Sequence, residues 1–413
     1  MIRRLLLIPL MAASTLFAQN GGSTYSRYGI GDLRPTGSSR SLAMGGTSIA
    51  VPSGYAVDAL NPALWARISR TQFAAGLLYE GYSASDDRKS NYLSSASFNG
   101  VAFALPLVPQ SGIALGAAVT PLSRINYNIT TPPYQDGSTL QYLGEGGVSQ
   151  AQIGTSVAPT GDLAFGAKLV YDFGTSRHTL RQDFPAGGST NSEVIRSARF
   201  SGLGGVFGLT YGGLKKVFGL PESNALTVGL VASTATSLKT AVDRYYTYVT
   251  SALTTRDTLS LPEGTFHVPA SFGAGLSYAT DRMILAADYS RQDWSAATID
   301  GTPLDGIRNE RRIAVGGEVL PRREASAPFF QRTSYEFGIF SEATYYEIKG
   351  QPIDETGVSA GMGLPLFTDT RLFFSASYSV RGTTDDHLQR DRIFRWSLTF
   401  VTGELWFVRP PEE

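Results

Sequence analysis

The sequence predicts an all-β protein, a transmembrane antiparallel β-barrel of about 14 strands with an N-terminal hatch (plug) in its lumen. Three observations lead to this class: an export leader, a suitable composition, and long segments with alternating polarity. The composition combines 45 Gly, 20 Tyr and 22 Phe in 413 residues with only 17% charged residues. In a barrel that faces lipid on one side, apolar and polar residues alternate along each strand. The mean hydropathy of such a chain is therefore average.

Residues 1–18 have the pattern of a secretory signal peptide. Arg3 and Arg4 precede an apolar run, and small residues surround Ala18. The run is shorter than the roughly 20 residues of a membrane-spanning helix, so we expect it to be cleaved before Gln19. Removing both arginines leaves 33 basic and 35 acidic residues. This balance argues against a nucleic-acid partner, which requires a basic surface.

The sequence contains no cysteine, which excludes disulfides and thiolate metal sites. We therefore expect no metal or cofactor, and stability that comes from burial and hydrogen bonds.

Residues 19–70 are expected to form the hatch. Gly45 and Gly46 permit a positive φ or a close backbone approach. Pro62 cannot donate to a strand ladder and moves Asn61 out of the helical region, so the triplet Asn61-Pro62-Ala63 predicts a turn or a helix start. These five residues are the predicted hatch and gating positions. The alternative is that Asn61 and Pro62 form a simple turn before the first strand.

The barrel is predicted over residues 71–408, with a short tail at 409–413. Alternation is clear in Arg371–Arg381, where Phe374 and Tyr378 share one face and Phe373, Ser375 and Arg381 the other. Alternation alone would also fit a soluble sandwich, but the segments are longer than globular strands. We expect strands near 71–82, 94–106, 112–127, 139–158, 162–177, 194–214, 224–239, 266–280, 282–295, 308–320, 333–347, 355–366, 370–381 and 392–408. Long polar loops are expected at 178–193 and 240–265.

Several phrases of the sequence resemble the FadL/TodX family of outer-membrane transporters. Met44-Gly45-Gly46, Asn61-Pro62-Ala63 and Phe73 to Tyr82 occur in the family's order behind the leader. Tyr25 to Gly29 looks like a subgroup from Bacteroidetes-like bacteria. The resemblance implies passive uptake of long-chain fatty acids or other hydrophobic small molecules, without a catalytic step. The alternative is a non-transport member of the same superfamily, either a partner in type IX-like protein secretion or a structural barrel.

Four residues are predicted ligand contacts in the lumen. Phe340 and Phe373 share the expected lumen face with polar residues, and a channel for amphiphiles needs such apolar patches. Arg371 and Arg381 could bind a carboxylate by paired hydrogen bonds. The alternative for the arginines is salt bridging to Glu336 or Glu342.

Three tryptophans, Trp294, Trp396 and Trp406, are predicted to lie at the membrane interfaces. The alternative is that some of them line a ligand site. The aromatic last strand is similar to the signal that barrel-assembly machinery recognises, although a tail follows it here. We also expect contact with outer-membrane lipid and lipopolysaccharide, in the bacterial outer membrane.

A barrel hydrolase is a third class, and it would need one of three histidines: His178, His267 or His387. Asp385-Asp386-His387 could supply an acid–histidine pair. Solvated loop positions are the simpler interpretation of all three.

Overall fold

The computed structural model describes residues 21–35, 37–52, 60–87, 89–185, 191–249, 254–322, 324, 326–367 and 369–404. The expected signal peptide at 1–18, Trp406 and the tail at 409–413 lie outside these ranges. Within them, no helix combines the length and the apolar character needed to cross a membrane.

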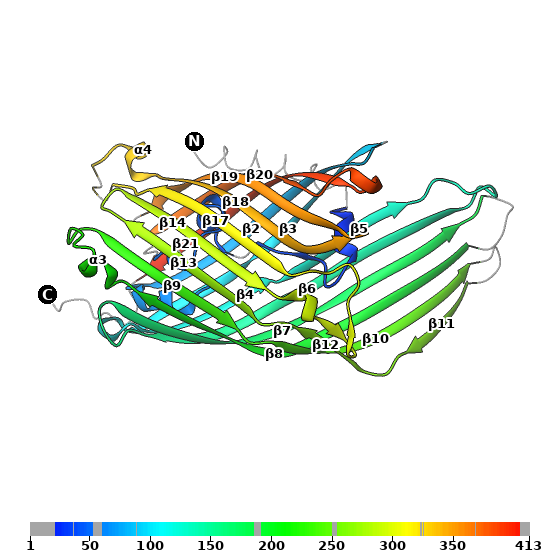
Figure 1. The fold of residues 1–413 in the computed structure, drawn as a ribbon, viewed down its shortest axis with the longest axis horizontal. Coiled ribbons are helices and arrows are strands. Elements are labelled where there is room, and N and C mark those ends of the chain that lie inside the picture. Colours follow the sequence, from blue (N-terminus) through cyan, green and yellow to red (C-terminus); the bar gives the residue numbers. More distant parts are fainter. Residues whose placement is uncertain are drawn as a thin grey trace, which may run out of the picture.

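The chain begins with short elements and continues into long strands (Figure 1). The N-terminal elements are η3 (Thr24–Arg27), β1 (Asp32–Leu33), α2 (Ser39–Ala43) and η4 (Pro62–Arg67). The first half of the wall contains β2 (Thr71–Ser85), β3 (Ser90–Val108), β4 (Ile113–Pro121), β5 (Ser123–Thr130), β6 (Thr139–Val157), β7 (Leu163–Asp183), β8 (Asn191–Tyr211), β9 (Ala225–Ser233) and β10 (Thr236–Val249).

The second half contains β11 (Thr254–Ser260), β12 (Gly264–Val268), β13 (Ser271–Ala279), β14 (Met283–Gln292), β17 (Glu310–Val319), β18 (Ser334–Ile348), β19 (Gln351–Phe367), β20 (Thr370–Arg381) and β21 (Arg390–Glu404). Short elements lie in the connections: η5 (Pro109–Ser111), α3 (Leu214–Val217), η6 (Trp294–Ala296), β15 (Thr298–Ile299), β16 (Thr302–Pro303), α4 (Phe329–Arg332) and η7 (Asp385–His387).

The wall is an antiparallel barrel of 14 strands that closes on itself. Closure is made by β2 and β21, which pair from Thr71 opposite Glu404 to Ser85 opposite Arg390. Three crossings are interrupted: β4 and β5 form one, β9 and β10 another, and β11 to β13 a third. Each predicted strand coincides with one crossing, which confirms the predicted fold class. Closure removes the unpaired edges that an open sheet would expose to lipid.

The two faces of the wall differ as a membrane barrel requires. Along β7, Phe165, Leu169 and Tyr171 point outward and are 41%, 51% and 46% exposed. The alternating residues, among them Lys168 and Asp172, are buried inside. A large apolar side chain that is exposed on every second position has lipid as its natural neighbour. The alternation in the sequence therefore marks lipid on one side and the lumen on the other.

The strands on one side of the barrel continue beyond the apolar band. Outward positions of β7 change from Phe173 to Thr175 and Arg177, so the hydrocarbon region ends there. β7 nevertheless continues to Asp183 and β10 to Val249, where β11 pairs with it. Figure 1 shows these strands reaching farther right than β14 and β17. The predictions of loops at 178–193 and 240–265 are therefore wrong over most of their lengths, because hydrogen-bonded strands continue there with polar side chains on their outward face.

The described N-terminal residues, 21–35, 37–52 and 60–70, contact the inner face of the wall; we call them the N-terminal segment. Helix α2 packs against β18 to β21, and η4 packs against β6, β7 and β8. These blue elements lie within the outline of the barrel in Figure 1. A chain stretch of this length fills space that a barrel of 14 strands would otherwise leave to water.

Candidate functional site

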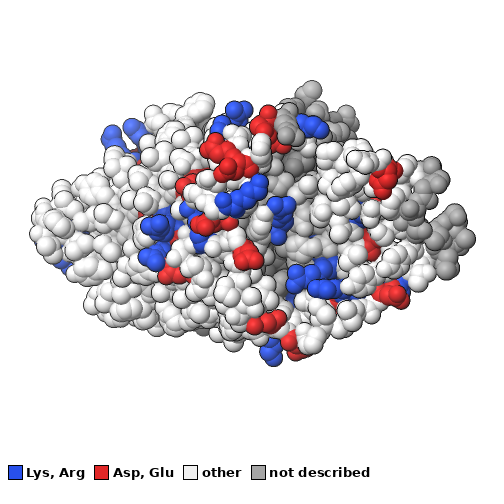
Figure 2. Space-filling model, turned by 45° about the vertical axis from the view of Figure 1, so that its right-hand side comes forward, with Lys and Arg blue, Asp and Glu red and all other residues white. Residues whose placement is uncertain are grey.

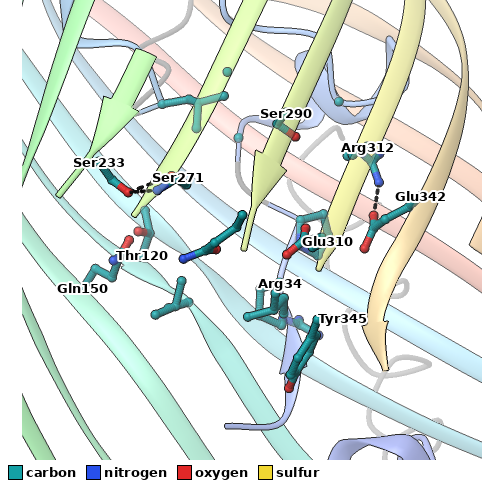
Figure 3. Close-up of a pocket in the computed structure, with 18 of the residues that line it drawn as sticks. Arg34, Thr120, Gln150, Ser233, Ser271, Ser290, Glu310, Arg312, Glu342 and Tyr345 are labelled. Atoms are coloured by element: carbon teal, nitrogen blue, oxygen red, sulfur yellow. Dashed lines mark hydrogen bonds and ion pairs between the residues drawn. The ribbon is translucent and has the colours of Figure 1, made fainter. Parts of the chain in front are cut away.

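A cavity of about 360 Å³ lies inside the barrel between the N-terminal segment and the wall. It has apolar and charged lining together (Figure 3). Leu33, Arg34 and Ile49 come from the N-terminal segment, and Glu310, Arg312 and Tyr345 from the wall. Figure 3 shows Arg312 paired with Glu342 across β17 and β18, with Glu310 and Tyr345 facing the same space. A cavity with both kinds of lining suits a small molecule that has an apolar body and polar groups.

The Asn61-Pro62-Ala63 triplet starts η4 and attaches it to the wall. Asn61 is fully buried; its Oδ1 accepts from the Ala63 N–H at 3.0 Å, and its Nδ2 donates to the Ile49 carbonyl at 2.7 Å. Pro62 occupies the first helical position, where its missing N–H costs nothing. A Cβ on Gly208 of β8 would lie 2.0 Å from Asn61 Oδ1. The triplet is therefore a helix cap seated against a glycine in the wall.

Gly45 and Gly46 form a sharp bend that touches the opposite wall. Their φ angles are +74° and +91°, a region that L side chains rarely adopt. The N–H of Gly45 donates to Ser359 Oγ at 3.0 Å, and Arg312 Nη2 donates to the Gly45 carbonyl at 2.8 Å. A Cβ on Gly338 of β18 would lie 2.1 Å from Gly45 N. Glycine on both sides thus permits direct backbone contact between segment and wall.

Buried ion pairs connect the N-terminal segment to the wall at several points. Arg34 pairs with Glu80, which also accepts from Arg395 Nε at 2.9 Å. Arg395 in turn reaches Glu355 at 2.6 Å. Asp32 accepts from Arg381 at 3.0 Å. Removing one partner of such a pair leaves a buried charge, so the network strongly favours the observed position of the segment.

A second connection is made by α2. Arg40 Nε donates to Glu318 Oε2 at 3.0 Å, and both side chains are at most 5% exposed. The N–H groups of Ser48 and Ile49 donate to Asp288 Oδ2 at 2.6 and 2.9 Å.

The start of the N-terminal segment fills an interruption in the wall. β5 pairs with β6 and β1, and among the described residues it makes no backbone pairing with β3. Gly21 packs at Leu93 of β3 and Gly22 at Asn126 of β5. Nearby, burial raises the pKa of Tyr25 to about 12, with Asp391 adding to the effect. Its hydroxyl therefore stays protonated and donates to the Gln389 carbonyl.

The four predicted lumen contacts all face inward, but only two line the cavity. Phe340 and Arg381 line it, whereas Phe373 and Arg371 do not. Arg381 is engaged with Asp32 and Asp391, at 3.0 and 3.1 Å. Phe373 packs with Trp65 in a separate cluster. The predicted alternative of salt bridging is realised for Arg381, with partners other than Glu336 and Glu342.

The two described tryptophans of the interface prediction have different positions. Trp294 is 1% exposed, lies in a cluster with Tyr345, and donates from Nε1 to Glu310 Oε2 at 3.1 Å. Its placement at the membrane interface is therefore wrong: η6 turns inward and the ring lines the cavity. Trp396 is on the outward face and stacks on Tyr79 with ring centroids 5.5 Å apart. Trp406 lies outside the described residues.

Each of the three histidines forms a hydrogen bond with a different partner. His178 Nδ1 bonds the Tyr127 hydroxyl, His267 Nδ1 the Ser237 hydroxyl, and His387 Nδ1 Asp87, each at 2.8 Å. A serine hydrolase needs a third group that orients the histidine, and the described residues complete no such triad. They likewise contain no cluster of three or more His, Cys, Asp or Glu that could hold a metal ion.

Sequence reasoning missed the residues of the ionic network. Glu80, Glu355 and Arg395 occupy inward positions of otherwise ordinary strands, and Asp32 and Arg34 precede the predicted hatch motif. The strand residues could have been recognised as charged residues at lumen-facing positions of an alternating strand, for example Glu80 between Leu78 and Tyr82. That signal gives the face of the residue, but not its partner.

The fold and its buried lumen define an outer-membrane β-barrel. The chain belongs to the BamG family, whose profile matches residues 1–410. No curated protein matches the chain.

Solved structures of a hydrocarbon channel, a toluene transporter and a FadL homologue share the fold. The CymD monoaromatic hydrocarbon channel is 16% identical with a TM-score of 0.59, covering 92% of this chain and 99% of that one. A Pseudomonas aeruginosa FadL homologue is 11% identical with a TM-score of 0.60, over 90% and 99%. The Pseudomonas putida toluene transporter TodX is 16% identical with a TM-score of 0.60, over 89% and 98%. The predicted FadL/TodX resemblance is thus confirmed as a resemblance in fold.

Proposed function

We propose that the protein is an outer-membrane channel for the passive uptake of hydrophobic small molecules, with long-chain fatty acids as the first candidates. The observation that carries the proposal is the cavity inside the barrel, where apolar and aromatic side chains lie beside many charged and polar ones. Two of the proteins that share the fold are a monoaromatic hydrocarbon channel and a toluene transporter. No step in this function requires a catalytic residue.

In this proposal residues 19–70 are the hatch and residues 71–408 the channel wall. Asn61, Pro62 and Ala63 set the position of η4, while Gly45 and Gly46 allow the bend against β18. Uptake requires the hatch to shift, since its contacts with the wall bound the cavity on one side. Export by the signal peptide, insertion by barrel-assembly machinery and contact with lipopolysaccharide belong to the same proposal.

The test is influx of a labelled long-chain fatty acid into vesicles that contain the refolded barrel. Empty vesicles and the Asn61→Ala/Pro62→Ala double variant are measured beside it. Saturable influx that the double variant alters, while its folded form still migrates in a heat-dependent way on gels, supports a gated channel. Equal influx into empty vesicles and into vesicles that contain the barrel would refute the proposal.

A second candidate is a role without transport, as a partner in protein secretion or as a structural barrel. Two observations favour it: membership in the BamG family, whose name specifies no transported compound, and the buried ion pairs that resist movement of the hatch. It predicts a stable protein partner, recovered by crosslinking in intact cells and mass spectrometry. Recovery of the barrel alone, together with saturable influx, would remove this candidate.

A further inference from the structure

Strand β11 has a partner on one side only. It pairs with β10 over its whole length, Thr254–Ser260, and among the described residues it pairs with no other strand. The crossing that follows along the chain consists of β14 and β15. It turns back at Gly301, beside β12, before it reaches the height of β11. In Figure 1, β11 accordingly forms the lower margin of the extended strands at right. β11 is therefore an edge strand.

Every second residue of β11 directs its backbone groups away from β10. The N–H of Leu261 donates to the Val242 carbonyl at 2.9 Å, which makes these two opposite residues a hydrogen-bonded pair. In an antiparallel ladder, hydrogen-bonded and non-hydrogen-bonded pairs alternate. Thr255, Asp257 and Leu259 are therefore the residues of β11 that bond to β10. The N–H and C=O groups of the remaining four residues point to the free edge: Thr254, Arg256, Thr258 and Ser260.

The free edge lies outside the hydrocarbon region. Its end nearest the membrane, Ser260, is in register with Asp243 of β10 and, through β8, with Arg177 of β7. The lipid-facing Phe173 is four residues nearer the membrane than Arg177. In outer-membrane barrels the longer extensions face the outside and the short turns face the periplasm. The edge of β11 is therefore in water on the outer side, where a second polypeptide can replace the water on its backbone groups.

β11 lacks the features that usually protect an edge strand. Its sequence, TTRDTLS, contains no proline and no lysine, and its three threonines favour extended backbone. Its register with β10 is continuous, without a bulge. The one basic side chain, Arg256, is turned back over the Tyr245 ring of β10, with its guanidinium carbon 4.3 Å from the ring centre. An unprotected edge of this kind is a template for pairing with another strand.

A second copy of this chain does not fit the edge. Two copies in one membrane are related by a rotation about the membrane normal, which places each residue of β11 at the height of the same residue in the other copy. Asp257 would then face Asp257, and Arg256 would face Arg256. Like charges directly opposite each other in a sheet are destabilising. The occupant that fits is therefore a segment of a different protein.

Two side chains on the inward face of β11 are available to such a segment. Figure 2 shows blue and red side chains interspersed over the face that it presents, and Arg199 and Asp243 form one such outward pair. Asp257, by contrast, makes no hydrogen bond or ion pair with another described residue. Leu259, two residues along the same face, is 48% exposed. An incoming strand that places a basic and an apolar residue opposite these two would complement both.

We propose that the edge of β11 binds an extended segment of a second protein on the outer side of the membrane, as an additional antiparallel strand. A basic residue of the segment lies opposite Asp257, an apolar residue opposite Leu259, and an acidic residue opposite Arg256. Main-chain hydrogen bonds supply the affinity, and these side-chain pairs supply the register and the choice of partner. The inference goes beyond the proposed transport function, because pairing at β11 requires no flux.

The test traps a peptide at the edge by thiol–disulfide exchange, with the full chain in zwitterionic nanodiscs. The chain has no cysteine, and Thr255→Cys places one thiol at an exposed position of β11. The cognate peptide, with blocked termini, is Thr-Val-Thr-Lys-Glu-Cys-Thr. In antiparallel register its valine lies opposite Leu259, its lysine opposite Asp257, its glutamate opposite Arg256 and its cysteine opposite the new thiol. The swapped peptide exchanges lysine and glutamate and keeps the composition, charge and thiol. Mass spectrometry measures the equilibrium constant of the mixed disulfide in a glutathione buffer.

We expect Thr255→Cys to prefer the cognate peptide by about fivefold or more, because two favourable charge pairs replace two unfavourable ones. At Asp281→Cys, in the exposed turn between β13 and β14, the two peptides should exchange equally. Adding Arg256→Asp and Asp257→Arg to Thr255→Cys should reverse the preference. N-methylation of the third peptide residue, whose N–H faces β11, should lower the constant by about fivefold or more. The N–H of the fourth residue points away, so its methylation should have little effect.

Equal constants for the two peptides at Thr255→Cys, or no reversal in the variant with exchanged charges, would overturn the proposal. Equal effects of the two N-methyl groups would also overturn it, because the peptide would then not be held by a ladder. All substituted positions of β11 are exposed, so folding should be preserved, and heat-dependent migration on gels verifies this for each variant.

Discussion

Substituting Arg40 by glutamine measures how firmly the N-terminal segment is held in the barrel. Arg40 and Glu318 are 5% and 4% exposed, so the substitution leaves a buried carboxylate without its cation. Breaking a buried pair in this way costs about 3–5 kcal/mol. If that cost acts on the attachment of the N-terminal segment to the wall, the equilibrium constant for local opening rises by about 10²- to 4 × 10³-fold.

The chain has no cysteine, so a single introduced thiol reports on opening without background. Ala43 in α2 is fully buried, and Ala43→Cys should react with a water-soluble maleimide only when the segment opens. We expect Arg40→Gln to accelerate this reaction by about 10²-fold or more. Asp281→Cys, in the exposed turn between β13 and β14, should keep its rate. An unchanged rate at Ala43→Cys in a folded barrel would refute the reasoning that this pair holds the segment.

Three further predictions concern the bend, the cap and the lipid face. Gly45→Ala should lower unfolding stability by about 1–3 kcal/mol, because φ is +74° and the Cβ would meet the Ile339 carbonyl; thermal unfolding measures this, and an unchanged midpoint contradicts it. Asn61→Ala should cost about 1 kcal/mol or more, because it removes the cap, and Asn61→Asp should cost at least as much in the same assay, because its buried carboxylate cannot donate to the Ile49 carbonyl; a smaller cost for Asn61→Asp would contradict this. Leu169→Arg should destabilise the barrel in vesicles by about 2–4 kcal/mol and Thr175→Arg by about 0–1, as urea titration would show; equal costs would place the membrane elsewhere.

The strands of the wall could be predicted from the sequence, because lipid on one face and the lumen on the other impose an alternation of residue types with a period of two. In β20 the predicted range, 370–381, is the observed one, and Phe373 and Arg381 face inward as predicted. The face follows from parity alone, since a shift of one residue would turn every side chain to the other side. The same alternation predicted that Phe340 faces the lumen, where its side chain is buried.

The partners of the buried charged residues and the courses of the short elements could not be predicted from the sequence. Arg381 binds Asp32, 349 residues away, and alternation carries no information on which distant segment fills the lumen. Trp294 follows a strand like an interfacial residue, but η6 turns it inward to Glu310. Strand β11, TTRDTLS, is exposed at every position, so no apolar face distinguished it from a loop. It forms because β10 offers it an aligned ladder.

The most direct test of the proposed channel is a reversible tether between the N-terminal segment and the wall. Ser39 Oγ lies 2.7 Å from Ser397 Oγ, close enough for Ser39→Cys/Ser397→Cys to form a disulfide. Labelled fatty-acid influx into vesicles is then measured with this variant oxidised and reduced. The account predicts influx at the level of empty vesicles when oxidised and at the wild-type level when reduced. Equal influx in both states, or no influx with the wild-type barrel, would contradict it.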